Sequence, residues 1–365
     1  MSAAQRFALS VLLATFLAAW DSTVVGTIGP TIVQHLGGLN LYPWMLTGFM
    51  VAATTLTPLV GSLSNHYSPA ILYRWSIGFF LLGSVGSAVA ESMSWFIGTR
   101  IMQGAGAGGI LTLGLIMMGQ YYQGVERVRM QGRLSAMWGL AGLLGPTLGG
   151  LFAQWLSWRF LFLINVPVGL IALFVMGPVE TSRAPTGAMR LDWRGALWLV
   201  AWLSTGLSSI TAFQQFPHTA VGWILLFSAL GLGIIWWNVE RRAVNPLVPL
   251  SWLKSRRITP PSLLALVASG TLYATVIVIP LWVYTAWHFA PLAVGLAILP
   301  LPVGWAAGSM FTAPLMSHFS LQAITRGGLL GMIVGMLLYQ MTWNGGEWIL
   351  IVCGSGVLGM GVGVV

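Results

Sequence analysis

Long apolar runs separated by short polar breaks make up most of the chain. The first run, residues 7–28, has the length of about 20 apolar residues that a helix needs to cross a bilayer. Membrane β-strands would instead give segments of about ten residues with alternating polar and apolar side chains. The pattern therefore predicts about twelve membrane-spanning helices, at residues 7–28, 42–63, 70–90, 95–121, 134–155, 160–176, 196–213, 221–239, 262–284, 292–316, 327–342 and 348–365.

Two longer polar breaks, at residues 177–194 and 240–261, divide these runs into groups. We interpret residues 1–178 as an N-terminal six-helix transmembrane bundle and residues 179–257 as two inserted helices with flanking cytoplasmic segments. Residues 258–365 then form a partial C-terminal transmembrane bundle. A short internal repeat supports the two bundles: His66-Tyr67-Ser68, followed by Arg74, recurs as His318-Phe319-Ser320, followed by Arg326. Such repeats are typical of the repeated halves of secondary transporters.

Composition agrees with a multi-pass, all-α membrane protein. Charged residues are 6% of the chain and hydrophobic residues 57%, whereas soluble domains have about 25% charged residues. The first run is too long for the core of a signal peptide and is interpreted as a retained helix. Cys353 is the only cysteine, so no disulfide framework is expected.

The basic residues predict the orientation of the chain. If the amino terminus is cytoplasmic, 14 of the 16 Lys and Arg residues fall in inner segments, as positive residues do in membrane proteins. Because this charge is spread over several loops, the net charge of +9 does not indicate a nucleic-acid partner. The inner residues are Arg6, Arg74, Arg127, Arg129, Arg133, Arg183, Arg190, Arg194, Arg241, Arg242, Lys254, Arg256, Arg257 and Arg326.

Asp21 and Arg100 are ionisable residues inside predicted spans. A charge at the centre of a spanning helix costs roughly 2.5–3.5 kcal/mol and usually marks an ion or proton pathway. Counted from the outer helix ends, Asp21 lies about 12 Å deep and Arg100 about 8 Å deep, so the two side chains can meet if their helices are neighbours. The alternatives are that Asp21 is a hydrogen-bonded structural residue and that Arg100 reaches the outer lipid headgroups.

The predicted fifth helix has a stripe of small residues with one proline. Glycines on one side of a membrane helix let another helix approach closely, and a proline removes a backbone hydrogen bond. We expect this face to pack tightly and to have no role in chemistry; its residues are Gly139, Gly142, Gly145, Pro146, Gly149 and Gly150.

Several motifs resemble the fourteen-helix drug/proton antiporters (EmrB/QacA type) of the major facilitator superfamily. Trp20-Asp21-Ser22-Thr23 looks like a first-helix motif of that family, and Arg100-x-x-Gln103-Gly104 is similar to its fourth-helix motif. Residues 139–150 match the antiporter motif of the fifth helix, and residues 158–169 are similar to a stretch typical of this subgroup. The resemblance covers essentially the whole chain.

The resemblance implies a major facilitator fold and a proton-coupled secondary transporter, not an enzyme. Such a protein would export amphipathic organic compounds or drugs across the bacterial inner membrane, driven by the proton-motive force without a cofactor. Asp21 and Arg100 would couple protons to transport. Trp20, Gln103, Trp138 and Asn165 are candidates for the substrate cavity. Packing against lipid or other helices is the favoured alternative for the two Trp side chains, and hydrogen bonding between helices is the favoured alternative for Gln103 and Asn165. A periplasmic adaptor is an open question.

Two departures from the family pattern change this picture. In the inner loop after the second helix, Gly61 is kept, but Asn65 stands where the family has an acidic residue, and Arg74 is the next basic residue. This gating loop is therefore degenerate.

The last apolar run ends at Val365, about two helices short of the family's fourteen. The alternatives to drug export are accordingly a specific solute or metabolite exporter of the same fold and a truncated, non-transporting membrane protein. The scattered histidines give no metal-ligand spacing, so no metal site is expected.

Overall fold

The computed structural model is helical throughout the residues it describes, and no strand occurs among them. The described residues are 3–177, 192–216, 219–243, 246–248, 250, 255–256, 258–316, 318–342 and 347–365. Of the predicted inner basic residues, Arg183, Arg190, Lys254 and Arg257 lie outside this part of the chain, as do residues 179–191 of the predicted inserted segment.

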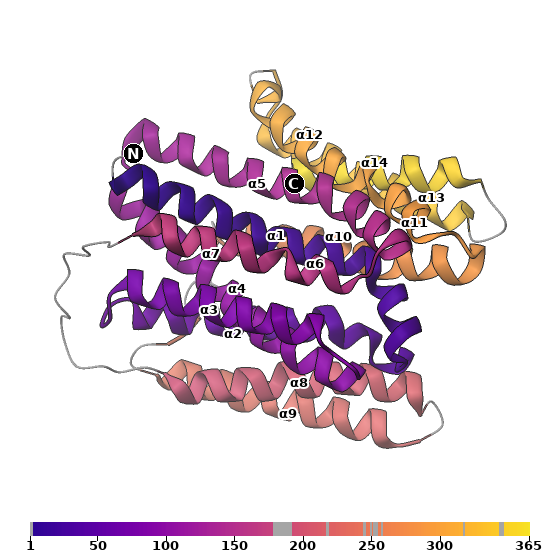
Figure 1. Ribbon diagram of the computed structural model, residues 1–365, viewed down its shortest axis with the longest axis horizontal. Coiled ribbons are helices and arrows are strands. Elements are labelled where there is room, and N and C mark those ends of the chain that lie inside the picture. The colour runs from indigo at the N-terminus through magenta and orange to yellow at the C-terminus, as the bar shows by residue number, and fades with distance from the viewer. Residues whose placement is uncertain are drawn as a thin grey trace. The chain divides into compact units, whose positions relative to one another are not determined.

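Long helices follow one another along the chain (Figure 1). The elements are α1 (Ala3–Leu36), the 3₁₀ turn η1 (Leu39–Leu41), α2 (Tyr42–Leu63), α3 (Pro69–Ala88), α4 (Met93–Tyr121), α5 (Gly124–Trp155), α6 (Arg159–Leu163), α7 (Asn165–Met176), α8 (Trp193–Gln215), α9 (Val221–Arg242), α10 (Thr259–Trp287), α11 (Pro291–Ile298), α12 (Pro300–Leu315), α13 (Leu321–Thr342) and α14 (Trp348–Val364).

The predicted all-α membrane architecture is confirmed. Among the described residues, ten helical segments are long and apolar enough to cross a membrane. These segments correspond to ten of the twelve predicted spans. The remaining two predicted spans form α8, which is not among these ten segments, and α14, which is apolar but has only 17 residues.

Two predicted spans are interrupted at a proline. The span at 160–176 divides into α6 and α7, and the span at 292–316 divides into α11 and α12. Pro167 and Pro302 lie four residues after Leu163 and Ile298, the last residues of α6 and α11. A proline has no N–H to donate to the carbonyl four residues earlier, which explains both breaks.

The chain divides into two compact units, and each combines segments that are distant in the sequence. The first unit comprises Met1–Ala18, Leu36–Leu134 and Phe162–Lys254. In it, α4 packs against both α2 and α3, α3 contacts α7, and α8 pairs with α9. Its core is apolar and includes Phe7, Tyr73, Phe80 and Met117, each fully buried.

The second unit comprises Ala19–His35, Ser135–Leu161 and Ser255–Val365. Here α14 packs against α12 and α13, and α10 contacts α11. Glycines permit the close approach of α14: a methyl group on Gly359 would overlap the Leu301 carbonyl oxygen, and one on Gly361 would lie 2.5 Å from the Gly328 carbonyl oxygen. The division of the chain into residues 1–178, 179–257 and 258–365 stays a prediction.

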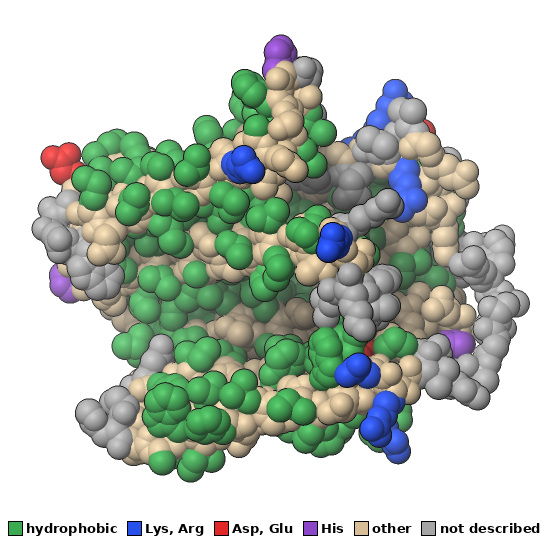
Figure 2. Space-filling model, turned by 180° about the vertical axis from the view of Figure 1, so that it is seen from behind, with side chains coloured by type: hydrophobic (Ala, Val, Ile, Leu, Met, Phe, Trp, Pro, Cys, Tyr) green, Lys and Arg blue, Asp and Glu red, His purple; other side chains and the backbone are tan. Residues whose placement is uncertain are grey.

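Hydrophobic side chains face outward over the long helices (Figure 2). Phe174 is 88% exposed, and Leu230 and Ile234 on α9 are also exposed. An outward apolar surface on this scale is unfavourable in water but matches the hydrocarbon of a bilayer. The protein is therefore a multi-pass membrane protein.

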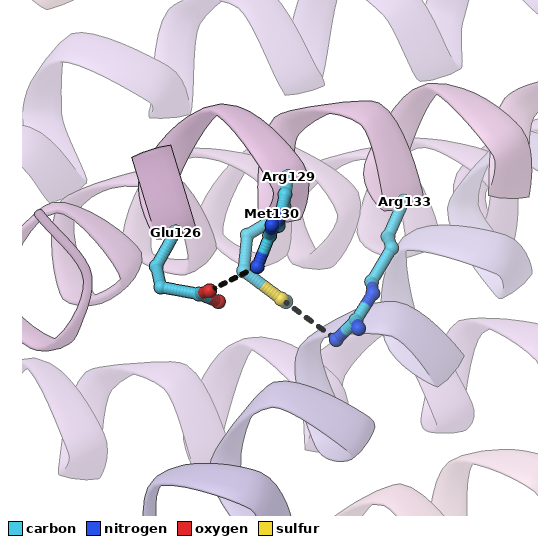
Figure 3. A network of polar contacts seen from close by, with 4 residues as sticks. All are labelled: Glu126, Arg129, Met130 and Arg133. Carbon is cyan, nitrogen blue, oxygen red and sulfur yellow. Dashed lines mark hydrogen bonds and ion pairs between the residues drawn. The ribbon is translucent and has the colours of Figure 1, made fainter. Parts of the chain in front are cut away.

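The first turns of α5 carry several charged side chains. At the start of α5, the Arg129 Nη1 donates to Glu126 Oε1 at 2.7 Å, and Arg133 Nη1 lies 3.4 Å from Met130 Sδ (Figure 3). Glu126 lies in the first turn, where a negative charge interacts favourably with the helix dipole. Because this ion pair is exposed, it contributes at most about 0.5 kcal/mol to stability.

The α8–α9 hairpin has a capped start. Asp192 Oδ1 accepts from the Gly195 backbone N–H at 2.8 Å, as an N-cap side chain does. The Oδ2 atom of Asp192 and the Oε2 atom of buried Glu240 both lie over Gly195, where a side chain larger than hydrogen would displace them. A side chain at position 195 would therefore have to move one or both carboxylates.

Candidate functional site

Asp21 is buried within α1 and is 2% exposed. It lies in the second unit, in the segment Ala19–His35, whereas Arg100 belongs to the first unit. The next residue, Ser22, donates its hydroxyl to the Ala19 carbonyl oxygen at 2.8 Å. The pairing of Asp21 with Arg100 stays a prediction.

Arg100 is completely buried within α4. Its Nε donates to the Met45 carbonyl oxygen on α2 at 3.3 Å, and its Nη1 donates to Gln103 Oε1. The guanidinium also lies over the Phe49 ring, with 4.4 Å from its central carbon to the ring centroid. Such contacts compensate part of the cost of removing a permanent charge from water. The side chain is thus held among protein groups rather than extended to lipid headgroups.

A hydrogen-bonded network connects Arg100 to two further helices. Gln103 Nε2 donates to Ser84 Oγ on α3 at 2.7 Å, and Asn165 Nδ2 on α7 donates to the same oxygen at 3.1 Å. Ser84 in turn donates to the Phe80 carbonyl oxygen at 2.9 Å. The exposed fraction is zero for Ser84 and Gln103 and 1% for Asn165. Gln103 and Asn165 therefore serve as interhelical connectors in the structure.

Glycines allow these helices to approach one another closely. A methyl group on Gly83 would lie 2.7 Å from the Gln103 backbone nitrogen, and one on Gly104 would overlap the Phe49 carbonyl oxygen. A methyl group on Gly169 of α7 would lie 2.5 Å from Leu81 Cδ2 on α3. Gly83, Gly104 and Gly169 thus bring the helices close enough for a short polar side chain such as Ser84 to bridge them.

The second unit contains a pocket with largely apolar walls. An aromatic pair forms part of the wall, because the Trp138 and Trp305 rings meet edge to face with centroids 6.2 Å apart. Hydroxyl groups come from Ser22, Thr23 and Tyr273, and none of the lining residues is charged. The complete lining is Ser22, Thr23, Trp138, Gly142, Pro146, Leu272, Tyr273, Val276, Ile298, Leu301, Pro302 and Trp305. The walls of the pocket suit a flat, predominantly apolar molecule.

The predicted packing face of α5 lies against three other segments of the second unit. A methyl group on Gly145 would overlap Thr23 of α1, and one on Gly142 would overlap Pro302 of α12. On Gly150 it would lie 2.7 Å from the Pro291 carbonyl oxygen. Thr23 also donates to the Ala141 carbonyl oxygen on α5 at 3.1 Å.

The remaining members of this face have looser surroundings. A methyl group on Gly149 would meet Thr27 and Ile28 at 3.4 Å or more, and one on Gly139 would lie 3.8 Å from Ala306. The Pro146 carbonyl lies against Gly295 of α11. Close approach is therefore required mainly at Gly142, Gly145 and Gly150.

The loop after α2 holds no charge network of its own. Asn65 is exposed, and its backbone N–H donates to the Ser62 carbonyl oxygen at 3.2 Å. A methyl group added to Gly61 would meet Thr112 at an ordinary contact distance of 3.8 Å. Arg74 donates instead to the carbonyl oxygen of Gly177, the residue that ends α7. A cation at this helix end interacts favourably with the last carbonyl groups.

The structure brings together only some of the predicted cavity residues. Trp138 lines the pocket, whereas Trp20 is 3% exposed and is not among the lining residues. Ser84, Tyr273 and Trp305 were missed by the sequence analysis, because single residues in apolar runs carry no distinguishing pattern. Among the described residues, no three His, Cys, Asp or Glu side chains are grouped so as to hold a metal ion.

Two known proteins illustrate the sequence similarity of this chain to others. Multidrug resistance protein 3 of Bacillus subtilis is 27% identical over 332 residues, covering 90% of this chain and 65% of the relative. A transporter of the acurin A biosynthesis cluster of Aspergillus aculeatus is 30% identical over 321 residues, covering 83% and 57%. The chain thus spans about two thirds or less of the length of these relatives.

Solved structures show the same fold. The structure of a D-xylose–proton symporter superposes with a TM-score of 0.66 at 14% identity, covering 100% of this chain and 80% of the symporter. The family model of the Major Facilitator Superfamily matches residues 11–365. Membership of a superfamily of transporters also agrees with the prediction that the protein is not an enzyme. The chain therefore belongs to the Major Facilitator Superfamily.

Proposed function

We propose that this chain acts as a proton-coupled exporter of amphipathic organic compounds, of the fourteen-helix drug/proton antiporter type. The pocket of the second unit is the observation that carries the proposal. Its aromatic rings and aliphatic side chains offer stacking and apolar contact without a fixed charge. Such a site accepts flat molecules of different shapes, as a drug exporter requires.

The pocket includes residues of the same motif that carries Asp21. Ser22 and Thr23 line it, and Asp21 directly precedes them on α1. We infer that Asp21 exchanges protons and that a change in its charge alters this stretch of α1. Arg100 would tune that exchange through its fixed positive charge. One proton that moves down 100 mV supplies about 2.3 kcal/mol, so no cofactor is needed for a modest substrate gradient.

Location and orientation are part of the same proposal. The distribution of Lys and Arg supports a cytoplasmic amino terminus. With the bacterial relative named above, it favours a bacterial inner membrane, with protons, lipid and small organic molecules as the partners.

The test is substrate-driven proton movement in proteoliposomes that contain the purified protein. The probes are flat aromatic dyes, beginning with Hoechst 33342, and an internal pH dye reports the protons. We expect Asp21→Asn to abolish the dye-driven pH change, because an amide cannot exchange a proton. Glu126→Gln is the matched control, since it also converts a carboxylate to an amide but at an exposed helix start.

Undiminished proton exchange by the Asp21→Asn variant would refute the role of Asp21. If none of the dyes is transported by a folded protein, a specific metabolite exporter becomes the better interpretation. The Aspergillus relative, whose name assigns it to a biosynthesis cluster, favours that second candidate. A screen of secondary metabolites with the same pH readout then separates the two functions.

A further inference from the structure

The hydroxyl group of Ser84 uses all of its hydrogen-bonding capacity within the first unit. A serine hydroxyl has one proton to donate and can accept two hydrogen bonds. The proton goes to the Phe80 carbonyl oxygen at 2.9 Å. The two acceptor positions take the amide groups of Gln103 and Asn165, at 2.7 Å and 3.1 Å.

This arrangement determines how the amide of Gln103 is turned. Because the only proton of Ser84 is already donated to the backbone, Ser84 can accept a bond from Gln103 but cannot donate one. Gln103 must therefore present its NH₂ group to Ser84. Its carbonyl oxygen is then directed to Arg100, where Nη1 donates to it. Without Ser84, either end of the amide could face the guanidinium, and only one of the two orientations accepts a hydrogen bond.

Burial makes this choice of orientation matter. Ser84, Gln103 and Arg100 are all fully buried, so water does not reach them to replace a lost partner. An unsatisfied polar group in such a place is costly, and hydrogen bonds in low dielectric are stronger than in water. The position of the guanidinium is consequently sensitive to a hydroxyl group on a different helix.

We propose that Ser84 is a positioning residue that fixes the orientation of the Gln103 amide and, through it, the guanidinium of Arg100. Asn165 completes the arrangement from α7 by occupying the second acceptor position of Ser84. The inference rests on the proposed function for its effect on transport, because Arg100 is there assigned to proton coupling. The orientation itself does not depend on that assignment and is measured separately.

The first measurement follows dye export by Ser84→Ala in proteoliposomes. We expect a turnover about tenfold lower at unchanged KM, because Arg100 loses an ordered partner while the pocket keeps its lining. Ser76→Ala is the matched control: Ser76 lies on the same helix and is also buried, but the hydrogen bond that it donates goes to the Leu72 carbonyl oxygen. Export by the Ser76 variant should remain within about twofold of the parent.

The second measurement needs no transport. In protein labelled with ¹⁵N-arginine, the Nε–H signal of Arg100 is identified by its loss in Arg100→Lys. We expect the signal to shift or broaden in Ser84→Ala and to stay unchanged in Ser76→Ala. Ser84→Thr keeps the hydroxyl group and should therefore give the parent signal.

The two measurements distinguish the possible failures. An unchanged Arg100 signal in a folded Ser84→Ala variant overturns the positioning role, whatever the transport result. If the Arg100 signal shifts but turnover is unchanged, the claim that Ser84 supports transport by positioning Arg100 is overturned. If Asp21→Asn exchanges protons normally while the Ser84→Ala signal shifts, the proposed coupling function fails and the positioning of Arg100 stands.

Discussion

Single polar side chains decide how their neighbours are oriented in this protein. At Ser84 one hydroxyl group receives two amides, and at Thr23 one hydroxyl group lies near the carbonyl oxygens of Trp20 and Ala141. Each hydroxyl connects its helix to one that is distant in the sequence, Ser84 through Asn165 on α7 and Thr23 through Ala141 on α5. In a bilayer no hydrophobic effect drives helices together, so their association depends on close packing and on interhelical hydrogen bonds such as these.

Trp305 provides a test of the pocket at the same scale. We expect Trp305→Ala to weaken dye binding about tenfold, because a buried aromatic contact contributes about 0.5–1.5 kcal/mol beyond its area. Trp305→Phe, which keeps a ring opposite Trp138, should lose less. Fluorescence titration in detergent measures the affinity. Trp155→Ala, at a side chain that is 69% exposed on α5, is the control, and an equal loss there would contradict the assignment of the pocket.

At the scale of elements, proline and glycine determine where helices break and how closely they pack. Pro167 and Pro302 account for the breaks after α6 and α11. Glycines on α5 and α14 remove the side chains that would otherwise separate them from their partners within the second unit. The same residue types recur in many membrane helices, so their number alone does not show which face is the packed one.

Gly145→Ala tests the close approach of α5 and α1. The added methyl group would overlap Thr23, so the two helices must separate or Thr23 must lose its bond to Ala141. We expect a destabilisation of about 1–3 kcal/mol, typical of overpacking. Gly270→Ala on α10, where nothing lies within 4 Å, is the matched control and should change stability little. Thermal unfolding of the purified variants gives the comparison, and equal midpoints would exclude this packing argument.

At the scale of the whole molecule, the apolar outer surface ties the chain to a bilayer. Leu230 lies near the middle of α9 and is 55% exposed. Arginine there should raise the free energy of membrane insertion by about 2.5–3.5 kcal/mol. Phe174→Arg, near the end of α7, should cost less because its side chain can extend to the interface.

Insertion into microsomes, read from glycosylation sites placed on either side of the helix, measures both variants. Equal insertion of the two would show that Leu230 does not face lipid. The exposed surface of α9 would then need a protein partner rather than hydrocarbon.

Hydropathy and charge along the chain predict the class of protein, which is confirmed, together with the approximate spans and the polar positions inside them. They also predict an orientation from the basic residues, which stays a prediction. These features depend on hydropathy and on side-chain charge, which each residue carries independently of its neighbours. The antiporter-type stripe on α5 was also visible, because its spacing is local to one helix.

Which polar residues meet, and which aromatic rings surround a pocket, depends on how the helices pack in the folded protein. Gln103 and Asn165 were candidates for a cavity, yet both donate hydrogen bonds to Ser84, which no sequence pattern had distinguished. Trp138 lines the pocket with Trp305, a residue more than 160 positions away in the chain. The physical reason is that in lipid the packed and the exposed faces of a helix are both apolar, so periodicity does not reveal the partners of each face.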